Sequence, residues 1–256
     1  MKKRILTALA ILFVTVFSAE PTTLRVLSYN LRFGQYASMG RFADYISAFD
    51  PDLVALQECD WATSRELAPA QNGIKFINVL AEKTGLFGIF GKAINYKGGY
   101  YGVGLLSRYP ILRYERVLLP NPECAEQRVI LVADVELPSG EVITFVSTHL
   151  DFSSSENRKK QAEFIVKYFA DSPQTVILAG DMNATPQSPE IQIFINAGWQ
   201  QMTDTEYTFS SVSPFVKIDY IFCRSARKAD VLSTKVCNDV KISDHFAVFS
   251  IIDINK

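Results

Sequence analysis

Short apolar runs rich in β-branched and aromatic residues recur through most of this chain. Their length is that of β-strands, and most are bounded by glycine, proline or polar residues, which favour turns. The runs occupy residues 24–31, 53–57, 102–106, 129–136, 142–147, 175–179, 218–223, 229–234 and 246–252. A chain with this pattern must bury most of its apolar surface in sheets, so we expect a sheet-based fold.

Four segments between these runs carry apolar residues at helical spacing. They lie near residues 42–49, 74–81, 162–169 and 191–195. Gly85 and Gly198 are expected to end the second and fourth helices, and Ser188-Pro189 has the form of an N-cap followed by a first-turn proline. Consecutive strand pairs mixed with a few helices favour two sheets packed face to face with helices outside. This α/β sandwich is preferred over a doubly wound parallel sheet.

The first residues have the three-part form of a secretory signal peptide. Lys2-Lys3-Arg4 precedes an apolar run from Ile5 to Phe17, and the small pair Ser18-Ala19 follows. We therefore assign residues 1–19 to a signal peptide and expect residues 20–256 to be exported, to the periplasm or the cell exterior, after cleavage. The run is short for a transmembrane helix, so an uncleaved anchor is the weaker alternative. No integral membrane segment is expected after cleavage.

The remaining chain, residues 20–256, is expected to form a single domain. No linker rich in proline, glycine or serine divides it. With 26 basic and 27 acidic residues, the formal net charge is -1. This balance offers no broad attraction to a nucleic-acid backbone, which disfavours a nucleic-acid partner without excluding one. The sequence leaves the oligomeric state open.

The four cysteines are Cys59, Cys124, Cys223 and Cys237. In an exported chain they allow up to two disulfides, with three full pairings, and we favour Cys223–Cys237 because this pair flanks a strand connection. The alternative is reduced, buried cysteines. Zinc binding is not expected, because the chain has no CxxC motif or paired His/Cys spacing.

The chain has only two histidines, and each lies in a short polar motif. These motifs are Ser147-Thr148-His149-Leu150 and Ser243-Asp244-His245. Four more polar motifs border apolar runs: Tyr29-Asn30, Leu56-Gln57-Glu58, Gly180-Asp181-Met182-Asn183 and Ile218-Asp219-Tyr220. Functional groups at strand ends suit a site along one rim of a sheet scaffold. The oxygen-bearing side chains suit Mg²⁺ better than zinc; they are Asn30, Glu58, Asp181, Asn183 and Asp244.

In order and type these motifs resemble the endonuclease/exonuclease/phosphatase superfamily. That group contains pancreatic-type deoxyribonuclease, apurinic endonucleases, bacterial sphingomyelinases and inositol polyphosphate phosphatases. The resemblance runs from about Leu24 to Ile252. It implies a four-layer, DNase I-like α/β sandwich and a metal-dependent hydrolase of phosphate esters, with Mg²⁺ as the cofactor and Mn²⁺ as a substitute.

The resemblance also implies roles at the metal and the attacking water. Glu58 would be the main metal ligand, supported by Asn30, and Asp244 would assist metal binding or orient its neighbour. Asp181 would orient or deprotonate the attacking water. Asn183 would hold phosphate or metal.

Other residues are implied to contact the phosphate. His245 would contact the scissile phosphate while a hydrogen bond to Asp219 fixes its ring. His149 would be a second hydrogen-bond donor to the phosphate or a general acid. Pancreatic-type nucleases pair this histidine with a glutamate, but no acidic residue lies at 96–104, so we favour phosphate binding. Tyr101, or its neighbour Tyr100, and Arg128 match family positions that contact phosphate, and a guanidinium suits bidentate recognition.

We therefore expect an exported, Mg²⁺-dependent phosphoesterase that hydrolyses a small or lipid-derived phosphate mono- or diester. A DNA or RNA endonuclease or exonuclease of the same superfamily is the alternative. A catalytically silent protein that binds a phosphate ligand is an alternative of another class. The expected rim loops are 121–127 and 207–215, and residues 85–99 are either an aromatic lip or a buried hairpin. Taken singly, Asn30 also reads as a turn residue and Tyr101 as packing.

Overall fold

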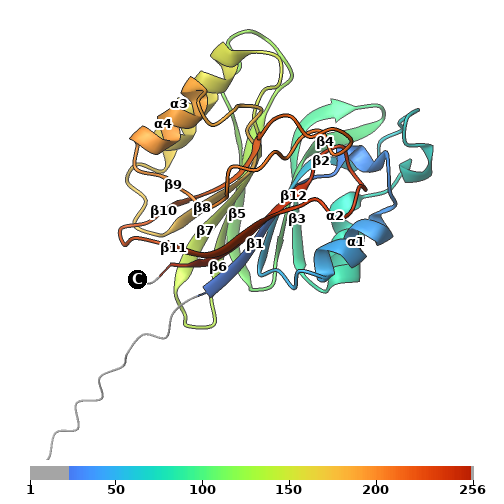
Figure 1. The fold of residues 1–256 in the computed structure, drawn as a ribbon. Helices are drawn as coiled ribbons and strands as arrows, with labels where there is room; N and C mark the ends of the chain where they lie inside the picture. Colours follow the sequence, from blue (N-terminus) through green and yellow to red (C-terminus); the bar gives the residue numbers. More distant parts are fainter. Residues whose placement is uncertain (1–22, 255–256) are drawn as a thin grey trace, which may run out of the picture.

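The computed structural model describes residues 23–254, which form two six-stranded mixed sheets and four α-helices (Figure 1). The predicted signal peptide, residues 1–19, lies outside the described residues. The two sheets pack face to face, with the helices on their outer faces. The four-layer sandwich expected from the sequence is therefore confirmed.

Each sheet is built around a central parallel pair of strands. The first sheet has the order β11-β12-β1-β2-β4-β3, and the second has the order β5-β6-β7-β8-β10-β9. The strands of the first are β1 (Thr23–Asn30), β2 (Leu53–Trp61), β3 (Phe87–Tyr96), β4 (Gly99–Ser107), β11 (Asp230–Cys237) and β12 (Ala247–Asp253). Those of the second are β5 (Ile111–Leu118), β6 (Val129–Glu136), β7 (Val142–His149), β8 (Val176–Asp181), β9 (Gln200–Gln201) and β10 (Asp219–Arg224). Only β1 with β2 and β7 with β8 are parallel; the other neighbours are antiparallel.

The helices cover the sheets in pairs (Figure 1). Helices α1 (Met39–Ser47) and α2 (Phe76–Thr84) pack on the first sheet, and α3 (Ser155–Tyr168) and α4 (Pro189–Asn196) on the second. Short 3₁₀ helices η1 (Arg32–Gly34) and η2 (Pro69–Gln71) lie in the connections. Within residues 23–254, no helix is long and apolar enough to cross a membrane.

The central strands bury both faces over most of their length, which explains why apolar residues occupy neighbouring positions in them instead of alternating strictly with polar ones. In β2, Leu53 and Ala55 face the core between the sheets, whereas Val54 and Leu56 pack in the layer below α1 and α2. Gly85 ends α2 with a φ of 72°, a left-handed conformation that glycine adopts without steric cost. Ser188 and Pro189 begin α4 as expected.

The edge strands are where the sequence interpretation was incomplete. Residues 85–99 form most of the β3–β4 hairpin rather than a free lip, and the two-residue turn Lys97-Gly98 has positive φ at both positions. Strand β5 was not expected, because most of its side chains are exposed and its sequence alternates too little to be distinguished from a loop.

The favoured disulfide between Cys223 and Cys237 is wrong. All four cysteines are free. Cys223 lies in the core between the two sheets, whereas Cys237 lies in the layer between the first sheet and its helices. The reduced, buried alternative holds for three of them, and Cys124 is exposed.

Candidate active site

The parallel pair in each sheet brings polar residues to the same edge of the sandwich. Asn30 ends β1 and pairs in register with Gln57, next to Glu58 on β2. In the second sheet, His149 at the end of β7 pairs with Asp181 at the end of β8. Because parallel neighbours end at the same edge of a sheet, each pair delivers two functional side chains to one rim.

Antiparallel neighbours complete the group from their first residues. Strand β10 runs antiparallel to β8 and begins at Asp219, which pairs with Asp181. Strand β12 runs antiparallel to β1, so His245, two residues before its start, lies beyond the end of β1. The site therefore spans both sheets.

Glu58 reaches the site through a β-bulge. The register of β2 against β4 shifts between Leu56 and Cys59, and Glu58 has a φ of 55°. A bulge of this kind turns a side chain out of the regular alternation of the strand. The carboxylate is buried, and burial raises the pKa of Glu58 above its ordinary value.

Asp181 is the residue on which the site converges. Asn30 Nδ2 donates a hydrogen bond of 3.1 Å to its Oδ2, and the Nε2 atoms of His149 and His245 lie 3.5 and 3.6 Å from the same oxygen. The backbone N–H of Asn183 donates to its other oxygen at 2.9 Å. Burial, and then the negative charge of Asp219, raise the pKa of Asp181 to about 7. A carboxyl group with such a pKa can exchange a proton near neutral pH.

The two histidines beside Asp181 carry different charges. Burial lowers the pKa of His245, but the negative charges of Asp219 and Asp181 and the 2.9 Å hydrogen bond between His245 Nδ1 and Asp219 outweigh it and raise the pKa to about 10. Burial, and then the charge of Arg128, hold the pKa of His149 well below its ordinary value. At neutral pH His245 is thus an imidazolium and His149 a neutral imidazole.

Arg128 sets the tautomer of His149. Its Nη1 lies 3.1 Å from His149 Nδ1, and a guanidinium can only donate, so Nδ1 accepts and the ring proton is on Nε2, facing Asp181. Arg128 is 4% exposed and also pairs with Glu126 at 3.3 Å. The partner of His149 is therefore Arg128, whereas the sequence comparison with pancreatic-type nucleases led us to look for a glutamate.

The predicted metal ligands lie together, with a guanidinium between two of them. Arg32 Nε is 3.3 Å from Asp244 Oδ2, and its Nη1 is 4.0 Å from Glu58 Oε1. Asn30 faces Glu58 through its nitrogen, since Nδ2 donates to Oε1 at 3.2 Å, while its own Oδ1 accepts from the backbone of Arg32. Asn30 Nδ2 thus donates hydrogen bonds to the carboxylates of both Glu58 and Asp181. This geometry fits a residue that links the two carboxylates better than a residue that binds a metal ion through its oxygen.

A second group could also hold a metal ion. Ligand atoms of Asp181, Asp219 and His245 lie within 4.8 Å of one another. However, His245 Nδ1 and Asp219 Oδ2 are already hydrogen-bonded to each other at 2.9 Å, so an ion bound through these two atoms would have to replace that hydrogen bond. The buried Glu58 carboxylate, flanked by Asp244, is the better match to a hard divalent ion.

A cavity of about 350 Å³ opens over these residues. It is lined by Arg32, Phe33, Glu58, Arg65, Tyr96, Tyr101, Glu126, Arg128, His149, Phe152, Asp181, Asn183, Phe209, Ile218 and His245. Tyr101 lines it, whereas Tyr100 is 41% exposed and lies below Lys92, so Tyr101 is the better match to the predicted phosphate contact. Asn183 lines it too, although its Nδ2 also donates to the Leu150 carbonyl at 3.0 Å.

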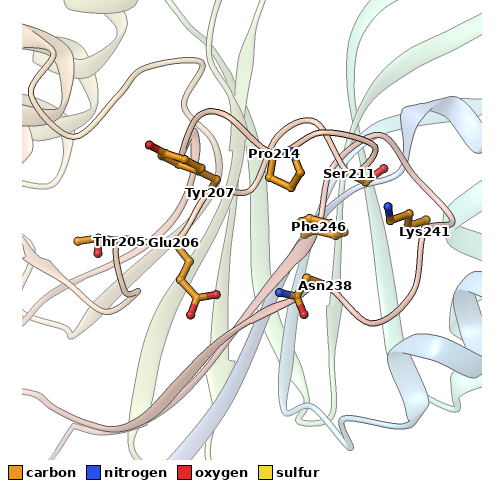
Figure 2. Close-up of a pocket in the computed structure, with 8 residues that line it drawn as sticks. All are labelled: Thr205, Glu206, Tyr207, Ser211, Pro214, Asn238, Lys241 and Phe246. Atoms are coloured by element: carbon orange, nitrogen blue, oxygen red, sulfur yellow. The ribbon is translucent and has the colours of Figure 1, made fainter.

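A larger hollow, of about 580 Å³, lies elsewhere and contains none of the predicted site residues (Figure 2). The segment from Thr205 to Pro214 forms one side, and Phe246 lies at its centre between Glu206 and Lys241. This hollow lacks the converging carboxylates and histidines. The smaller cavity is therefore the candidate active site.

Several lining residues were missed by the sequence interpretation. Arg32 and Phe33 come two and three residues after Asn30, and both have positive φ, so an arginine this close to the Tyr29-Asn30 motif was a usable signal. Phe209, whose ring centroid lies 4.8 Å from that of His245, falls within the expected rim loop 207–215, although it was not singled out there. Arg65 and Phe152 carried no signal.

Known proteins resemble this chain over most of its length. The model of the Endonuclease/Exonuclease/phosphatase family matches residues 27–245. The uncharacterized protein YbhP of Escherichia coli (strain K12) is 24% identical over 238 residues, which is 87% of this chain and 93% of that protein.

Solved structures share the fold at low sequence identity. The endonuclease/exonuclease/phosphatase of Beutenbergia cavernae superposes with a TM-score of 0.78 at 21% identity, covering 91% of this chain and 72% of that one. The mannosyl-6-phosphatase of Bacteroides thetaiotaomicron gives 0.70 at 19% identity, covering 90% and 99%. D. rerio TDP2 complexed with single strand DNA product gives 0.67 at 20% identity, covering 91% and 99%.

Proposed function

This chain belongs to the endonuclease/exonuclease/phosphatase family, and we propose that it is an exported, Mg²⁺-dependent phosphoesterase that hydrolyses a small or lipid-derived phosphate mono- or diester. The observation that carries the proposal is the convergence of Asn30, His149 and His245 on the buried carboxylate of Asp181. A purely structural cluster has no need to place these groups around an open cavity.

The residues of the site have two proposed roles in hydrolysis. One accepts a proton from water, and the others donate hydrogen bonds to the phosphate. Asp181, with a pKa of about 7, is suited to orient a water and take its proton. His245 remains cationic through neutral pH and can offer Nε2–H to a phosphate oxygen. The neutral ring of His149 presents Nε2–H beside it, and Tyr101 and Arg128 line the same cavity. Fixed donors aimed at the phosphate stabilise charge in the transition state.

Glu58 and Asp244 are the residues that would hold the divalent cation. When bound, such an ion supplies Lewis-acid stabilisation of negative charge on the phosphate. Asn30 keeps the Glu58 and Asp181 carboxylates in fixed positions through one amide group. Arg32, which lies between Glu58 and Asp244, balances part of their charge.

The substrate proposal rests on charge and size. A formal net charge of -1 and a cavity of about 350 Å³ with five aromatic lining residues suit a compact ester better than a duplex. Those five are Phe33, Tyr96, Tyr101, Phe152 and Phe209. The likeness of fold to a mannosyl-6-phosphatase supports a small ester, and the likeness to TDP2 with its single strand DNA product keeps a nuclease as the second candidate.

Hydrolysis of bis(p-nitrophenyl) phosphate and p-nitrophenyl phosphate by residues 20–256 tests the reaction. We expect turnover that chelation abolishes and Mg²⁺ or Mn²⁺ restores, and that Asp181→Asn removes while Asp171→Asn, at an exposed carboxylate, does not. Phosphate binding without turnover of any ester in a panel of sugar phosphates, phospholipids and DNA would favour the silent binding protein. Cell fractionation of the full chain and of a chain lacking residues 2–19 tests export.

A further inference from the structure

A second, smaller cavity adjoins the candidate active site. It has a volume of about 190 Å³ and shares three lining residues with the larger one: Phe33, Arg65 and Tyr96. Glu66, Leu67 and Lys97 complete its wall. Because the two cavities share these side chains, they lie next to each other, and a group bound in the second would be a neighbour of a substrate held in the first.

Arg65, at the junction of the two cavities, is held rigidly. Its Nε and Nη2 donate to the two oxygens of Asp60 at 2.6 and 3.0 Å, and this carboxylate is 1% exposed. Thr63 Oγ1 donates to the same carboxylate at 2.7 Å. The guanidinium carbon lies 4.2 Å from the ring centroid of Phe33 and 4.3 Å from that of Tyr96. One edge of the guanidinium is therefore used for structure, and its plane is fixed between two rings.

The other edge of this guanidinium is available. Arg65 Nη1 donates no hydrogen bond to the part of the chain that the structure describes. The side chain is 13% exposed, so the free edge is turned to the cavities rather than widely to solvent. A planar donor held in place loses little entropy when it binds an anion.

The loop geometry brings a second cation to the same cavity. Ser64 N donates to the carbonyl of Lys97 at 3.0 Å, and Arg65 N donates to Asn72 Oδ1 at 2.6 Å. The β3–β4 turn is thus tied to the segment that carries Arg65, and Lys97 lies on the cavity wall. Glu66 is the only carboxylate on this wall, and its side chain is exposed.

We propose that this cavity is a subsite for a second phosphate group of the substrate, held by Arg65 and Lys97. The inference rests on the proposed phosphoesterase function and narrows it to esters that carry a further phosphate beside the one that is hydrolysed. That phosphate belongs either to a small bisphosphate or to the neighbouring nucleotide of a single-stranded nucleic acid. Arginine recognises the oxygens of a phosphate through parallel N–H groups, and lysine adds a point charge.

Matched substrates with and without the second phosphate test the subsite. The small pair is fructose 6-phosphate and fructose 1,6-bisphosphate, and the strand pair is the dinucleotide TpT and its 5′-phosphorylated form pTpT. We expect the second phosphate to raise kcat/KM about tenfold within at least one pair, the size of one hydrogen bond to a charged group. A higher kcat/KM for fructose 1,6-bisphosphate than for fructose 6-phosphate would identify a small bisphosphate as the substrate. A higher kcat/KM for pTpT than for TpT would identify a single-stranded nucleic acid.

The variants must leave the buried Asp60 satisfied. Arg65→Met alone would leave the buried carboxylate of Asp60 without its cationic partner, so the first test variant combines Asp60→Asn with Arg65→Met. The second test variant is Lys97→Gln, at an exposed side chain. Arg113→Met, which removes one positive charge from a side chain that is 72% exposed on β5, is the control for Lys97→Gln, and Arg113→Met together with Asp134→Asn, which removes an arginine–carboxylate ion pair outside both cavities, is the matched control for the double variant. We expect the ratio of kcat/KM between matched substrates to fall about tenfold in the double variant, severalfold in Lys97→Gln, and not in either control.

The outcomes separate this inference from the proposed function. Equal losses for both members of a pair, or no advantage from the second phosphate in the unaltered protein, would overturn the subsite while leaving the phosphoesterase intact. If no substrate is hydrolysed, the phosphoesterase proposal fails. Calorimetric binding of the same four compounds still decides the subsite, because equal affinity for the members of each pair would contradict it.

Discussion

Replacing Asp219 by asparagine tests the charge state of the site, because Asp219 is the main cause of the raised pKa of His245. The substitution keeps the shape of the side chain and removes its negative charge. Asp219 Oδ2 lies 2.9 Å from His245 Nδ1, and its charge also raises the pKa of Asp181. Both pKa values are therefore expected to fall in Asp219→Asn. The pH range of activity should move as a whole to lower pH.

The magnitude follows from the pKa of His245. It is raised from 6.5 to about 10, which corresponds to a preference of the folded protein for the imidazolium on the order of 5 kcal/mol. Without the charge of Asp219, burial lowers the pKa with less opposition, and His245 becomes neutral within the working pH range. We expect kcat/KM at pH 8.5 to fall about 10²-fold, as for loss of one positioned proton donor.

The assay is the pH dependence of kcat/KM for bis(p-nitrophenyl) phosphate, with Asp171→Asn as the control for removing a carboxylate. The same substitution should also change how stability depends on pH. A group whose pKa rises on folding stabilises the protein fully below its unfolded value of 6.5 and loses that contribution as pH rises through about 10. The unaltered protein should thus lose stability between these values and Asp219→Asn should not. A descending limb of activity that stays near pH 10 in Asp219→Asn would refute the reasoning.

Three further predictions concern the metal and the packing of the site. Glu58→Gln removes the charge of the proposed main ligand, so the Mg²⁺ concentration for half-maximal activity should rise at least tenfold; an unchanged Mg²⁺ titration would exclude Glu58 as a ligand. Arg32→Gln removes a cation 3.3 Å from Asp244, so Mg²⁺ should bind more tightly by calorimetry, and weaker binding would show that Arg32 does not compete with the ion. In Gly180→Ala the added Cβ would lie 2.1 Å from the backbone oxygen of Thr148, so thermal unfolding should show a loss of about 1–3 kcal/mol or more. Gly40→Ala, a helical position with room for a Cβ, should be neutral or stabilising by about 0.5–1 kcal/mol, and equal effects at both glycines would contradict the packing argument.

The parts of the fold that were predictable from the sequence are those buried on both sides. Strands β2 and β8 begin with the apolar runs 53–56 and 176–179, and the polar residues that follow each run mark the rim of the sheet. Strand β5 escaped prediction because an edge strand needs few buried side chains. The disulfide prediction failed because sequence spacing does not say to which face of a sheet a cysteine points.

The candidate site was predictable as a set of residues but not as a set of contacts. Asn30, His149 and Asp181 are found at strand ends as expected, and the structure places them around one carboxylate. That Arg128 donates to His149, rather than only to a phosphate, depends on the approach of two strands and has no signature in either motif. Arg65 lies between rings contributed by η1 and β3, so its importance appears only after folding.

The position of β12 has a consequence for how activity arises during synthesis. Among the strands that the structure describes, β12 comes last in the sequence, yet it lies between β11 and β1, and the residues just before it include Asp244 and His245. A partly synthesised chain can form local hairpins such as β3–β4 and β6–β7, but it cannot assemble the proposed catalytic group until β12 has emerged and inserted. The nascent protein is therefore expected to stay inert toward phosphate esters until its last strand is made, and loss of that strand should abolish activity even where much of the rest folds.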